Sequence, residues 1–322
     1  MKRAKQALGA AAAVAAAVAI AGCGTQGTSA TPSLVLDFTP NAIHTGIYEA
    51  IAHGAKLNLI VPGESTDAIS LLVGHRVTFA ILDIHDLAIA DAQGKDLVGV
   101  MAIVERPLAS VIAAPQYPSP KDLTHGALIG VTGDPSDLAV LHSIVRGAGG
   151  NPAHLHTIVI GYNAVPDLLD GRVAAATAFW NDEGVQIAAA KPGFHIFRVE
   201  DYGAPAYPEL VLSTTATEIR QHPQTVRTLV HELVAGYVDV LKDPTAGEHA
   251  LLSRVSGLNA QQVEAQLQGE LPAYIPPGGG EPGALVPSTL NAWAVWEGKF
   301  GIVTKRPDIA TMFNSSFLPT QK

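Results

Sequence analysis

Polar and aromatic side chains follow four apolar runs of this sequence, at the points where each run ends. The four stretches are residues 38–48, 83–86, 133–137 and 179–183. Ligands of open α/β sheets collect outside the carboxyl ends of the strands, so side chains at these points can meet in one cleft. A single stretch is weak evidence, because strand ends are often polar only for solvation. Four stretches in order along the chain predict a ligand site.

The stretch AFWNDEGVQ carries the most specific chemistry of the four. Trp180 follows an apolar run, and Glu183 lies near the start of an expected helix. A carboxylate in a partly desolvated cleft can take two hydrogen bonds from an amidine-like edge, such as the ring nitrogen and exocyclic amine of an aminopyrimidine. The alternative is that Glu183 only complements the helix dipole and that Trp180 belongs to the core.

The histidines give a less specific signal. His44, in the stretch NAIHTG, could exchange a hydrogen bond with a ligand, and the alternative is a solvated loop side chain. His154 and His156 form a close pair that we expect on the surface, because no HExxH pattern accompanies them. The sequence also has no G-x-S-x-G, P-loop or Rossmann glycine pattern. We therefore expect no metal site, no cofactor and no catalytic residues.

Short apolar runs alternate with longer periodic segments, which predicts a layered α/β architecture with mostly parallel strands. The predicted strands are 34–37, 58–61, 79–82, 97–104, 110–114, 128–132, 157–160, 174–178, 194–199 and 209–214. Helices are expected between them at 67–73, 137–148, 164–169 and 185–190. The first starts at a Ser65 or Thr66 cap and the second at Ser136 or Asp137.

The last hundred residues are predicted to be helical, at 223–241, 245–254, 259–271, 287–300 and 309–314. Residues 274–283 (YIPPGGGEPG) should form a surface loop between two of these helices.

Two proline-rich stretches, residues 114–126 and 202–215, are expected to cross between two α/β lobes. The first lobe would comprise residues 34–114 and 210–322, and the second would comprise residues 115–209. Two extended crossings form the two-segment hinge that a bilobal binding protein needs.

The N-terminal residues have the pattern of an export signal. Lys2, Arg3 and Lys5 precede an apolar run that ends in Ile20-Ala21-Gly22-Cys23. This ending resembles the lipobox of bacterial lipoproteins, in which the cysteine is lipidated. An ordinary secretory signal with an accidental cysteine is the alternative. We expect residues 1–22 to be a signal peptide and residues 23–33 to be the lipidated Cys23 and a flexible tether.

Composition limits the function further. With 48% hydrophobic and 15% charged residues, the 322-residue chain can bury a large core. It carries 29 acidic against 20 basic residues, so nucleic acid is a poor partner. Cys23 is the only cysteine, which excludes an intramolecular disulfide and cysteine-based catalysis.

Four motifs together resemble the substrate-binding lipoproteins of ABC importers in the thiamine-precursor-binding family, which is similar to fungal thiamine-pyrimidine synthases. They are LDFTPNAIHTGIY, GVTGDPSDLAVL, AFWNDEGVQ and FRVEDYGAPAYPELVL, and the match runs from residue 34 to the C-terminal SSFLP. The resemblance implies a type II periplasmic-binding-protein fold and a monomeric, extracytoplasmic receptor anchored to the membrane through Cys23. It further implies an importer permease and its ATPase as partners, and a small heteroaromatic ligand, above all a pyrimidine thiamine precursor.

The resemblance also implies roles for particular residues. It makes Phe38 a stacking aromatic and Glu183 the carboxylate that recognises the ligand. The remaining expected ligand-site residues, which include those at the cleft rim and hinge, are Asn41, His44, Tyr48, Asp83, Pro135, Ser136, Asp137, Trp180, Asn181, Tyr202 and Tyr207. The chain departs from the family at Phe38, where many relatives have Trp, and in a shortened segment after Tyr48. Both departures bear on ligand identity.

Other functions remain open. A riboflavin-like solute or a sulfonate could occupy the same fold, although a sulfonate needs a cationic or helix N-terminal site and Glu183 argues against one. An enzyme like the fungal synthases is disfavoured. The iron segment of those enzymes is rich in cysteine, whereas Cys23 is the only cysteine in this chain.

Overall fold

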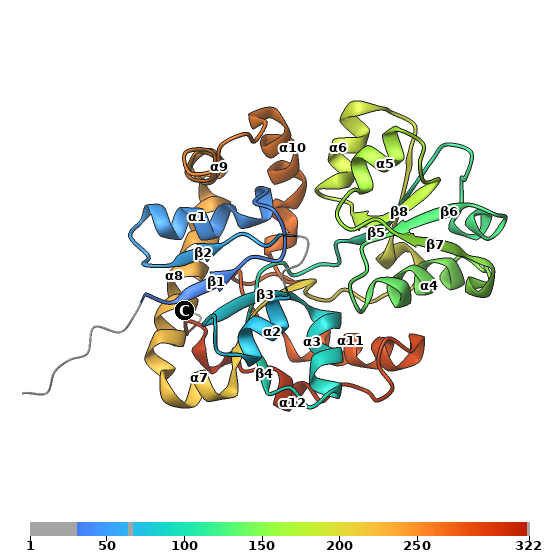
Figure 1. Ribbon diagram of the computed structural model, residues 1–322. Coiled ribbons are helices and arrows are strands. Elements are labelled where there is room, and N and C mark those ends of the chain that lie inside the picture. The colour runs from blue at the N-terminus through green and yellow to red at the C-terminus, as the bar shows by residue number, and fades with distance from the viewer. Residues whose placement is uncertain (1–30, 64–66, 321–322) are drawn as a thin grey trace, which may run out of the picture. The chain divides into compact units, whose positions relative to one another are not determined.

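Two five-stranded sheets form the framework of the chain. A computed structural model describes residues 31–63 and 67–320, and both sheets lie in one compact unit that begins at Thr31. The first sheet has the strand order β2-β1-β3-β10-β4 and the second has the order β7-β6-β8-β5-β9 (Figure 1). The strands are β1 (Ser33–Val35), β2 (Asn58–Ile60), β3 (Phe79–Asp83), β4 (Leu97–Ala102), β5 (Ala109–Ala113), β6 (Leu128–Val131), β7 (His156–Val159), β8 (Ala175–Phe179), β9 (His195–Arg198) and β10 (Leu210–Thr215).

Each of these strands overlaps a range predicted from its apolar run, so the positions of the strands are confirmed. The expectation of mostly parallel pairing is wrong. β5 runs antiparallel to β8 and β9, and β10 runs antiparallel to β3 and β4. The chain enters each of these two strands from the other half of the molecule. Each strand therefore runs opposite to the neighbouring strands of its sheet.

The two crossings between the sheets lie at residues 103–108 and 203–209. The second falls within the predicted range, whereas the first comes earlier than the predicted 114–126. Residues 109–113 were expected in the first lobe, but they form β5 in the second sheet. The chain leaves the first sheet at Glu105-Arg106-Pro107, a polar break inside an otherwise apolar run whose proline cannot donate to a strand ladder.

Helices cover both sheets. The first sheet carries α1 (Thr45–Ala52), α2 (Ala68–Val73) and α3 (Ile84–Ala92), and the second carries α4 (Asp137–Gly147), α5 (Ala164–Leu169) and α6 (Glu183–Ala190) (Figure 1). The C-terminal helices are α7 (Ala216–Gln221), α8 (Pro223–Lys242), α9 (Pro244–Leu252), α10 (Ala260–Glu270), α11 (Pro287–Phe300) and α12 (Ile309–Met312). Single 3-10 turns occur at Ala42–His44, Pro120–Thr124, Pro152–His154, Val199–Tyr202, Leu271–Tyr274 and Ser315–Phe317.

These bounds confirm the predicted helical segments and the loop after Tyr274. Asp67 caps α2 by accepting from the Ser70 amide, while the predicted caps Ser65 and Thr66 lie outside the described residues. Ser136 occupies the cap position of α4 but makes no side-chain capping bond.

The packing of β1 and α8 shows how the first lobe is built. Along β1 and the residue after it, Leu34 and Leu36 enter the core beneath α1 and α8, whereas Val35 enters the core on the other face. Buried residues recur at helical spacing along α8, which gives it one apolar face: Val226, Leu229, Val230, Leu233, Val234, Tyr237 and Val240.

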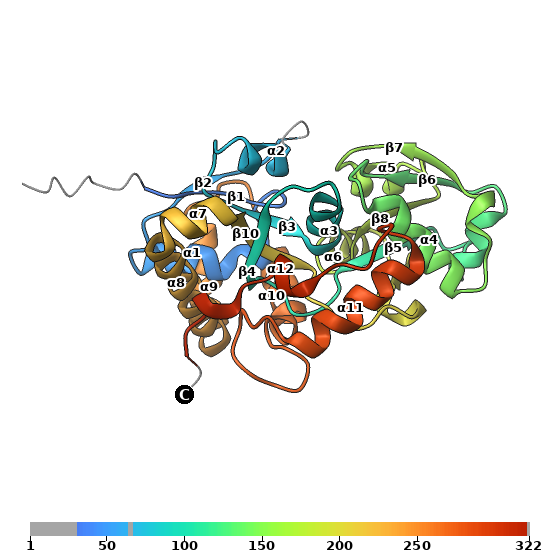
Figure 2. The same ribbon diagram turned by 90° about the horizontal axis from the view of Figure 1, so that it is seen from below.

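Helix α11 joins the two halves of the molecule. It lies alongside α3 and reaches toward α4 (Figures 1 and 2). Leu290 and Trp293 of α11 belong to one continuous buried cluster with Val140 and Leu141 of α4.

The expected signal peptide, Cys23 and most of the tether lie outside the described residues. Within the described ranges, every helix is too short or too polar to cross a lipid bilayer.

Candidate functional site

A cavity of about 410 Å³ lies between the two sheets. Its walls come from the ends of β1 and β3 in the first lobe and from the ends of β6 and β8 in the second. All four predicted strand-end stretches contribute to it, as expected for ligands that collect at the carboxyl ends of strands. The volume is within the range of small-molecule pockets in proteins.

Seven of the predicted ligand-site residues line this cavity. Phe38 and Asn41 follow β1, Asp83 ends β3, and Glu183 begins α6. The other three are Pro135, Ser136 and Asp137 at the start of α4.

Glu183 combines the two roles that its position suggested. It is the first residue of α6 and it also lines the cavity. Its Oε2 accepts a hydrogen bond from the Phe179 amide at 3.0 Å. Burial, followed by the negative charge of Asp182, raises the pKa of Glu183 to about 8. At neutral pH this carboxyl therefore holds a proton, so that it offers one donor and one acceptor to the cavity.

Asp182 is a cavity residue that the sequence analysis missed. It is buried and accepts hydrogen bonds from the side-chain amides of Gln186, at 2.9 Å, and Gln266. Asn41 of the first lobe lies 3.5 Å away. Burial raises the pKa of Asp182 as well. Its position next to Glu183, just after a predicted strand, is the sequence signal that could have identified it as a site residue.

His44 lies behind the cavity wall. Its Nδ1 accepts from the Asn41 amide at 3.1 Å, so its proton is on Nε2, which donates to Asp37 at 3.0 Å. The side chain of His44 is completely buried, while Asp37 lines the cavity. His44 therefore lies outside the cavity lining and holds Asp37, which belongs to it, in place.

Aromatic rings from both lobes meet at the cavity. Phe38 contacts Tyr162 edge to face, with ring centroids 4.8 Å apart and planes at 86°. Tyr162 and Phe179 also line the cavity. The sequence analysis missed Tyr162 because it considered four strand ends, and Tyr162 follows a fifth, that of β7.

Carboxyl groups dominate the polar lining of the cavity. Among the described residues, the lining contains one lysine, Lys95, against eight acidic residues: Asp37, Asp67, Asp83, Asp86, Asp134, Asp137, Asp182 and Glu183. The ionised members of this wall repel anions, and its carboxyl oxygens accept from ligands that carry N–H donors.

The two lobes touch at the cavity in this structure. The Ser136 amide at the start of α4 donates to Asp86 of α3 at 3.1 Å. Together with the Phe38–Tyr162 contact, this bond links the first lobe to the second. Burial raises the pKa of Asp86 to about 6, although the bond from Ser136 opposes the rise.

Three predicted site residues pack elsewhere. Tyr48 is buried in the first core on α1, which packs against α8 and α9. Trp180 donates to the Pro107 carbonyl at 3.0 Å, and the Arg198 guanidinium stacks 3.9 Å above its ring. Asn181 is buried and donates to Glu270 at 2.7 Å.

The two tyrosines expected at the hinge also lie outside the cavity lining. Tyr202 packs edge to face on Phe197 in the second lobe. Tyr207 is completely buried, and its hydroxyl lies 3.0 Å from Nε2 of His85. By contrast, His154 and His156 are exposed, as predicted.

Two α/β lobes with a cavity between their strand ends define a periplasmic-binding-protein fold, which confirms the predicted fold class. The alkanesulfonate-binding protein of Xanthomonas axonopodis pv. citri, solved with MOPS, shares this fold with a TM-score of 0.68 and 15% identity, over 88% of this chain and 98% of that one. Residues 41–247 match the family described as NMT1/THI5 like, and the chain belongs to that family.

Two curated relatives are similar in sequence. The formylaminopyrimidine-binding protein of Halalkalibacterium halodurans is 27% identical over 248 residues, which is 73% of this chain and 75% of the relative. A putative thiamine biosynthesis protein of Haemophilus influenzae is 28% identical over 189 residues, which is 56% of this chain and 60% of that protein.

Proposed function

We propose that this protein is the solute-binding component of an ABC importer and that it captures a small aminopyrimidine, most closely a thiamine precursor of the formylaminopyrimidine type. It acts without catalysis and delivers the ligand to a permease that an ATPase drives. The kinship with a formylaminopyrimidine-binding protein supports this ligand class. So does a cavity of suitable size between the two lobes.

The observation that carries the proposal is Glu183 at the cavity wall. Its carboxyl holds a proton at neutral pH because its pKa is about 8. The protonated oxygen donates to the ring nitrogen of the pyrimidine, and the other oxygen accepts from the exocyclic amine. Oε2 is suited to the second role, because its bond from the Phe179 amide leaves one lone pair for the ligand.

The acidic lining favours this ligand over a sulfonate. A sulfonate would meet eight acidic residues and Lys95 in the described wall. Anion sites need cations or several free backbone amides. At the start of α4, where such amides would be expected, the Ser136 amide already donates to Asp86.

Export and anchoring follow from the N-terminal sequence. We propose that residues 1–22 are removed and that lipid on Cys23 holds the protein on the outer side of the membrane. The variant Cys23→Ser should then appear in the soluble fraction, while the wild type sediments with membranes. If the variant stays on the membrane, the lipid anchor is not what holds the protein there.

A thermal-shift panel tests the ligand class. The mature protein is melted with formylaminopyrimidine, hydroxymethylaminopyrimidine, riboflavin, a purine and an alkanesulfonate. A ligand at 100 times its Kd stabilises the folded state by about 2.7 kcal/mol, so the aminopyrimidines should raise the melting temperature and the sulfonate should not. Stabilisation by the sulfonate alone would contradict the proposal.

A further inference from the structure

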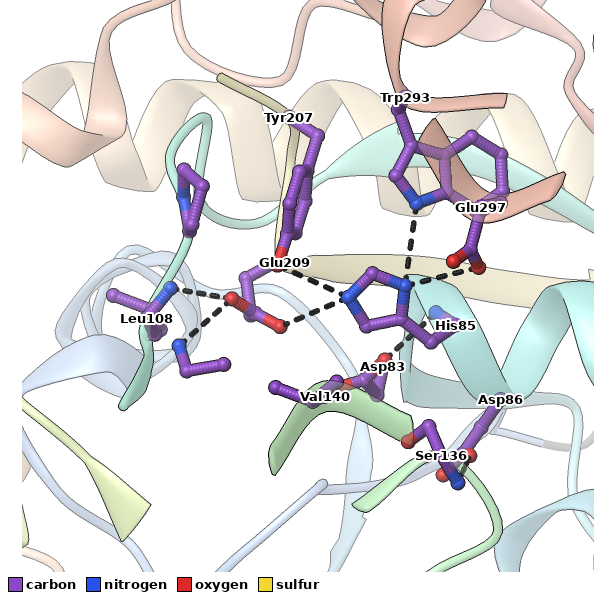
Figure 3. A network of polar contacts seen from close by, with 12 residues as sticks. Asp83, His85, Asp86, Leu108, Ser136, Val140, Tyr207, Glu209, Trp293 and Glu297 are labelled. Atoms are coloured by element: carbon purple, nitrogen blue, oxygen red, sulfur yellow. Dashed lines mark hydrogen bonds and ion pairs between the residues drawn. The ribbon is translucent and has the colours of Figure 1, made fainter. Parts of the chain in front are cut away.

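A histidine and two carboxyl groups lie close together at the edge of the cavity that Asp83 lines. Asp83 ends β3, His85 lies in the first turn of α3, and Glu209 precedes β10 (Figure 3). Each offers one ligand atom, and these atoms all lie within 4.8 Å of one another. His85 and Glu209 are completely buried, whereas Asp83 also lines the cavity.

Contacts on the far side of the ring orient His85 toward this group. Nδ1 of His85 lies 3.0 Å from Oε1 of Glu297, a buried residue of α11 (Figure 3). Nδ1 also lies 3.3 Å from Nε1 of Trp293. When Glu297 accepts from Nδ1–H, Nε2 is the ring nitrogen that faces Glu209, and metal-binding histidines are commonly held in this way. Nε2 lies 3.9 Å from Oε1 of Glu209 and 3.0 Å from the Tyr207 hydroxyl.

Glu209 supplies the second observation. Its Oε2 accepts from the amides of Leu108 and Ala109, so those two bonds fix the carboxyl group (Figure 3). Its Oε1 is fully buried and has no hydrogen-bond donor among the described residues. A buried carboxylate oxygen without a donor is costly, and a positively charged species beside it removes that cost.

We propose that Asp83, His85 and Glu209 bind a divalent transition-metal ion such as Zn²⁺. Imidazole nitrogen and carboxylate oxygen are both among the ligand types that bind this ion. The Tyr207 oxygen lies on the same side of the imidazole as Nε2 and is placed to become a fourth ligand. The ion would displace the protons that the buried acids otherwise need.

The test is a calorimetric titration of the EDTA-treated, dialysed mature protein with Zn²⁺ alone, together with metal analysis. We expect one tightly bound ion per chain, and Co²⁺ in its place should give the visible absorption of a low-coordinate site. Glu209→Gln should weaken Zn²⁺ binding by more than about 100-fold. Glu297→Gln, which removes the carboxylate that holds His85 from its far side, should weaken it by about 10- to 100-fold.

Two exposed histidines provide the control, because each lies near carboxylates on the surface. His53 approaches Glu49 and Asp239, and His222 pairs with Glu218. The double variant His53→Gln/His222→Gln should bind Zn²⁺ as the wild type does. If Glu209→Gln does not fold, Tyr207→Phe with its Co²⁺ spectrum serves instead, and a change in the absorption band is expected.

Absence of stoichiometric Zn²⁺ binding would overturn the proposal. Protons alone would then neutralise the buried carboxyl groups of Asp83 and Glu209. Loss of binding in the surface double variant would overturn it as well. Because no pyrimidine is present in the titration, either result leaves the proposed transport function untouched.

Discussion

At the scale of single residues, the protonation of Glu183 decides how the cavity recognises a ligand. A neutral carboxyl has one donor and one acceptor in the arrangement that an aminopyrimidine edge needs. Asp182 contributes from beside it, since its negative charge adds to burial in raising the pKa of Glu183 to about 8. The pair therefore keeps a proton available where a single exposed glutamate would be ionised.

This account predicts different outcomes for two substitutions of Glu183. Glu183→Ala should weaken aminopyrimidine binding by about 30- to 1000-fold, which corresponds to about 2–4 kcal/mol for lost hydrogen bonds to a buried group. Glu183→Gln keeps one donor and one acceptor, so its affinity should stay within about tenfold of the wild type. Calorimetric titration measures both values.

The pH dependence of binding separates the same variants. Wild-type affinity should fall as pH rises through about 8, where Glu183 loses its proton. The glutamine variant should show no fall in that range, because its side chain does not titrate. Glu218→Ala removes an acidic residue from the first turn of α7, away from the cavity, and should leave affinity unchanged at every pH. An equal pH profile for wild type and Glu183→Gln would remove Glu183 from the site.

Some site residues could be predicted from the sequence and others could not. Phe38, Asn41 and Glu183 follow apolar runs directly, so strand-end geometry brings them to the cavity. Tyr48 and Trp180 lie outside the cavity lining, because the direction of a side chain in a helix or turn depends on packing that sequence spacing does not show. The His85–Glu209 group gave no signal, since its members meet only when β10 returns beside β3.

At the scale of elements, a close crossing of α1 and α8 positions the loop that carries Asn41. Gly46 of α1 and Gly236 of α8 allow the contact, because a Cβ at Gly236 would lie 2.1 Å from the Gly46 carbonyl oxygen. The hydroxyl of Tyr237 then donates to the Ile43 carbonyl at 2.8 Å, and that of Tyr274 donates to the Ala42 carbonyl at 2.9 Å. These bonds fix the 3-10 turn that Asn41 caps.

Gly236→Ala should therefore destabilise the fold. The added methyl group must push α8 away from α1, and overpacking of this kind costs about 1–3 kcal/mol. Gly298→Ala in α11 is the matched control, because the nearest atoms to its Cβ lie at 3.7 Å. That control should be neutral or should stabilise by up to about 1 kcal/mol through helix propensity. Chemical denaturation measures both changes, and equal stabilities of the two variants would contradict the crossing.

The strands and most helices followed from apolar periodicity, although α1, α3 and α7 were not predicted. The membership of the strands in the two lobes did not follow from it. The runs at 97–104 and 110–114 are both apolar apart from Ser110, so composition could not assign them to different sheets. Only the pairing of Val111 with Thr177 and Phe197 places the second run in the second sheet.

At the scale of the whole molecule, the two lobes have separate sheets but share a buried cluster through α11. The crossings at 103–108 and 203–209 connect the sheets on one side of the cavity, and contacts such as Ser136 to Asp86 connect the lobes at the cavity itself. This arrangement fits a receptor whose lobes close over a ligand by hinge motion.

A crystal structure of the protein with bound formylaminopyrimidine tests the central claim most directly. We predict that the pyrimidine lies between the lobes, with its ring nitrogen and exocyclic amine within hydrogen-bond distance of the two carboxyl oxygens of Glu183. The ring should also contact Phe38 or Tyr162. A pyrimidine bound outside the cavity, or one whose aminopyrimidine edge faces away from Glu183, would contradict the account.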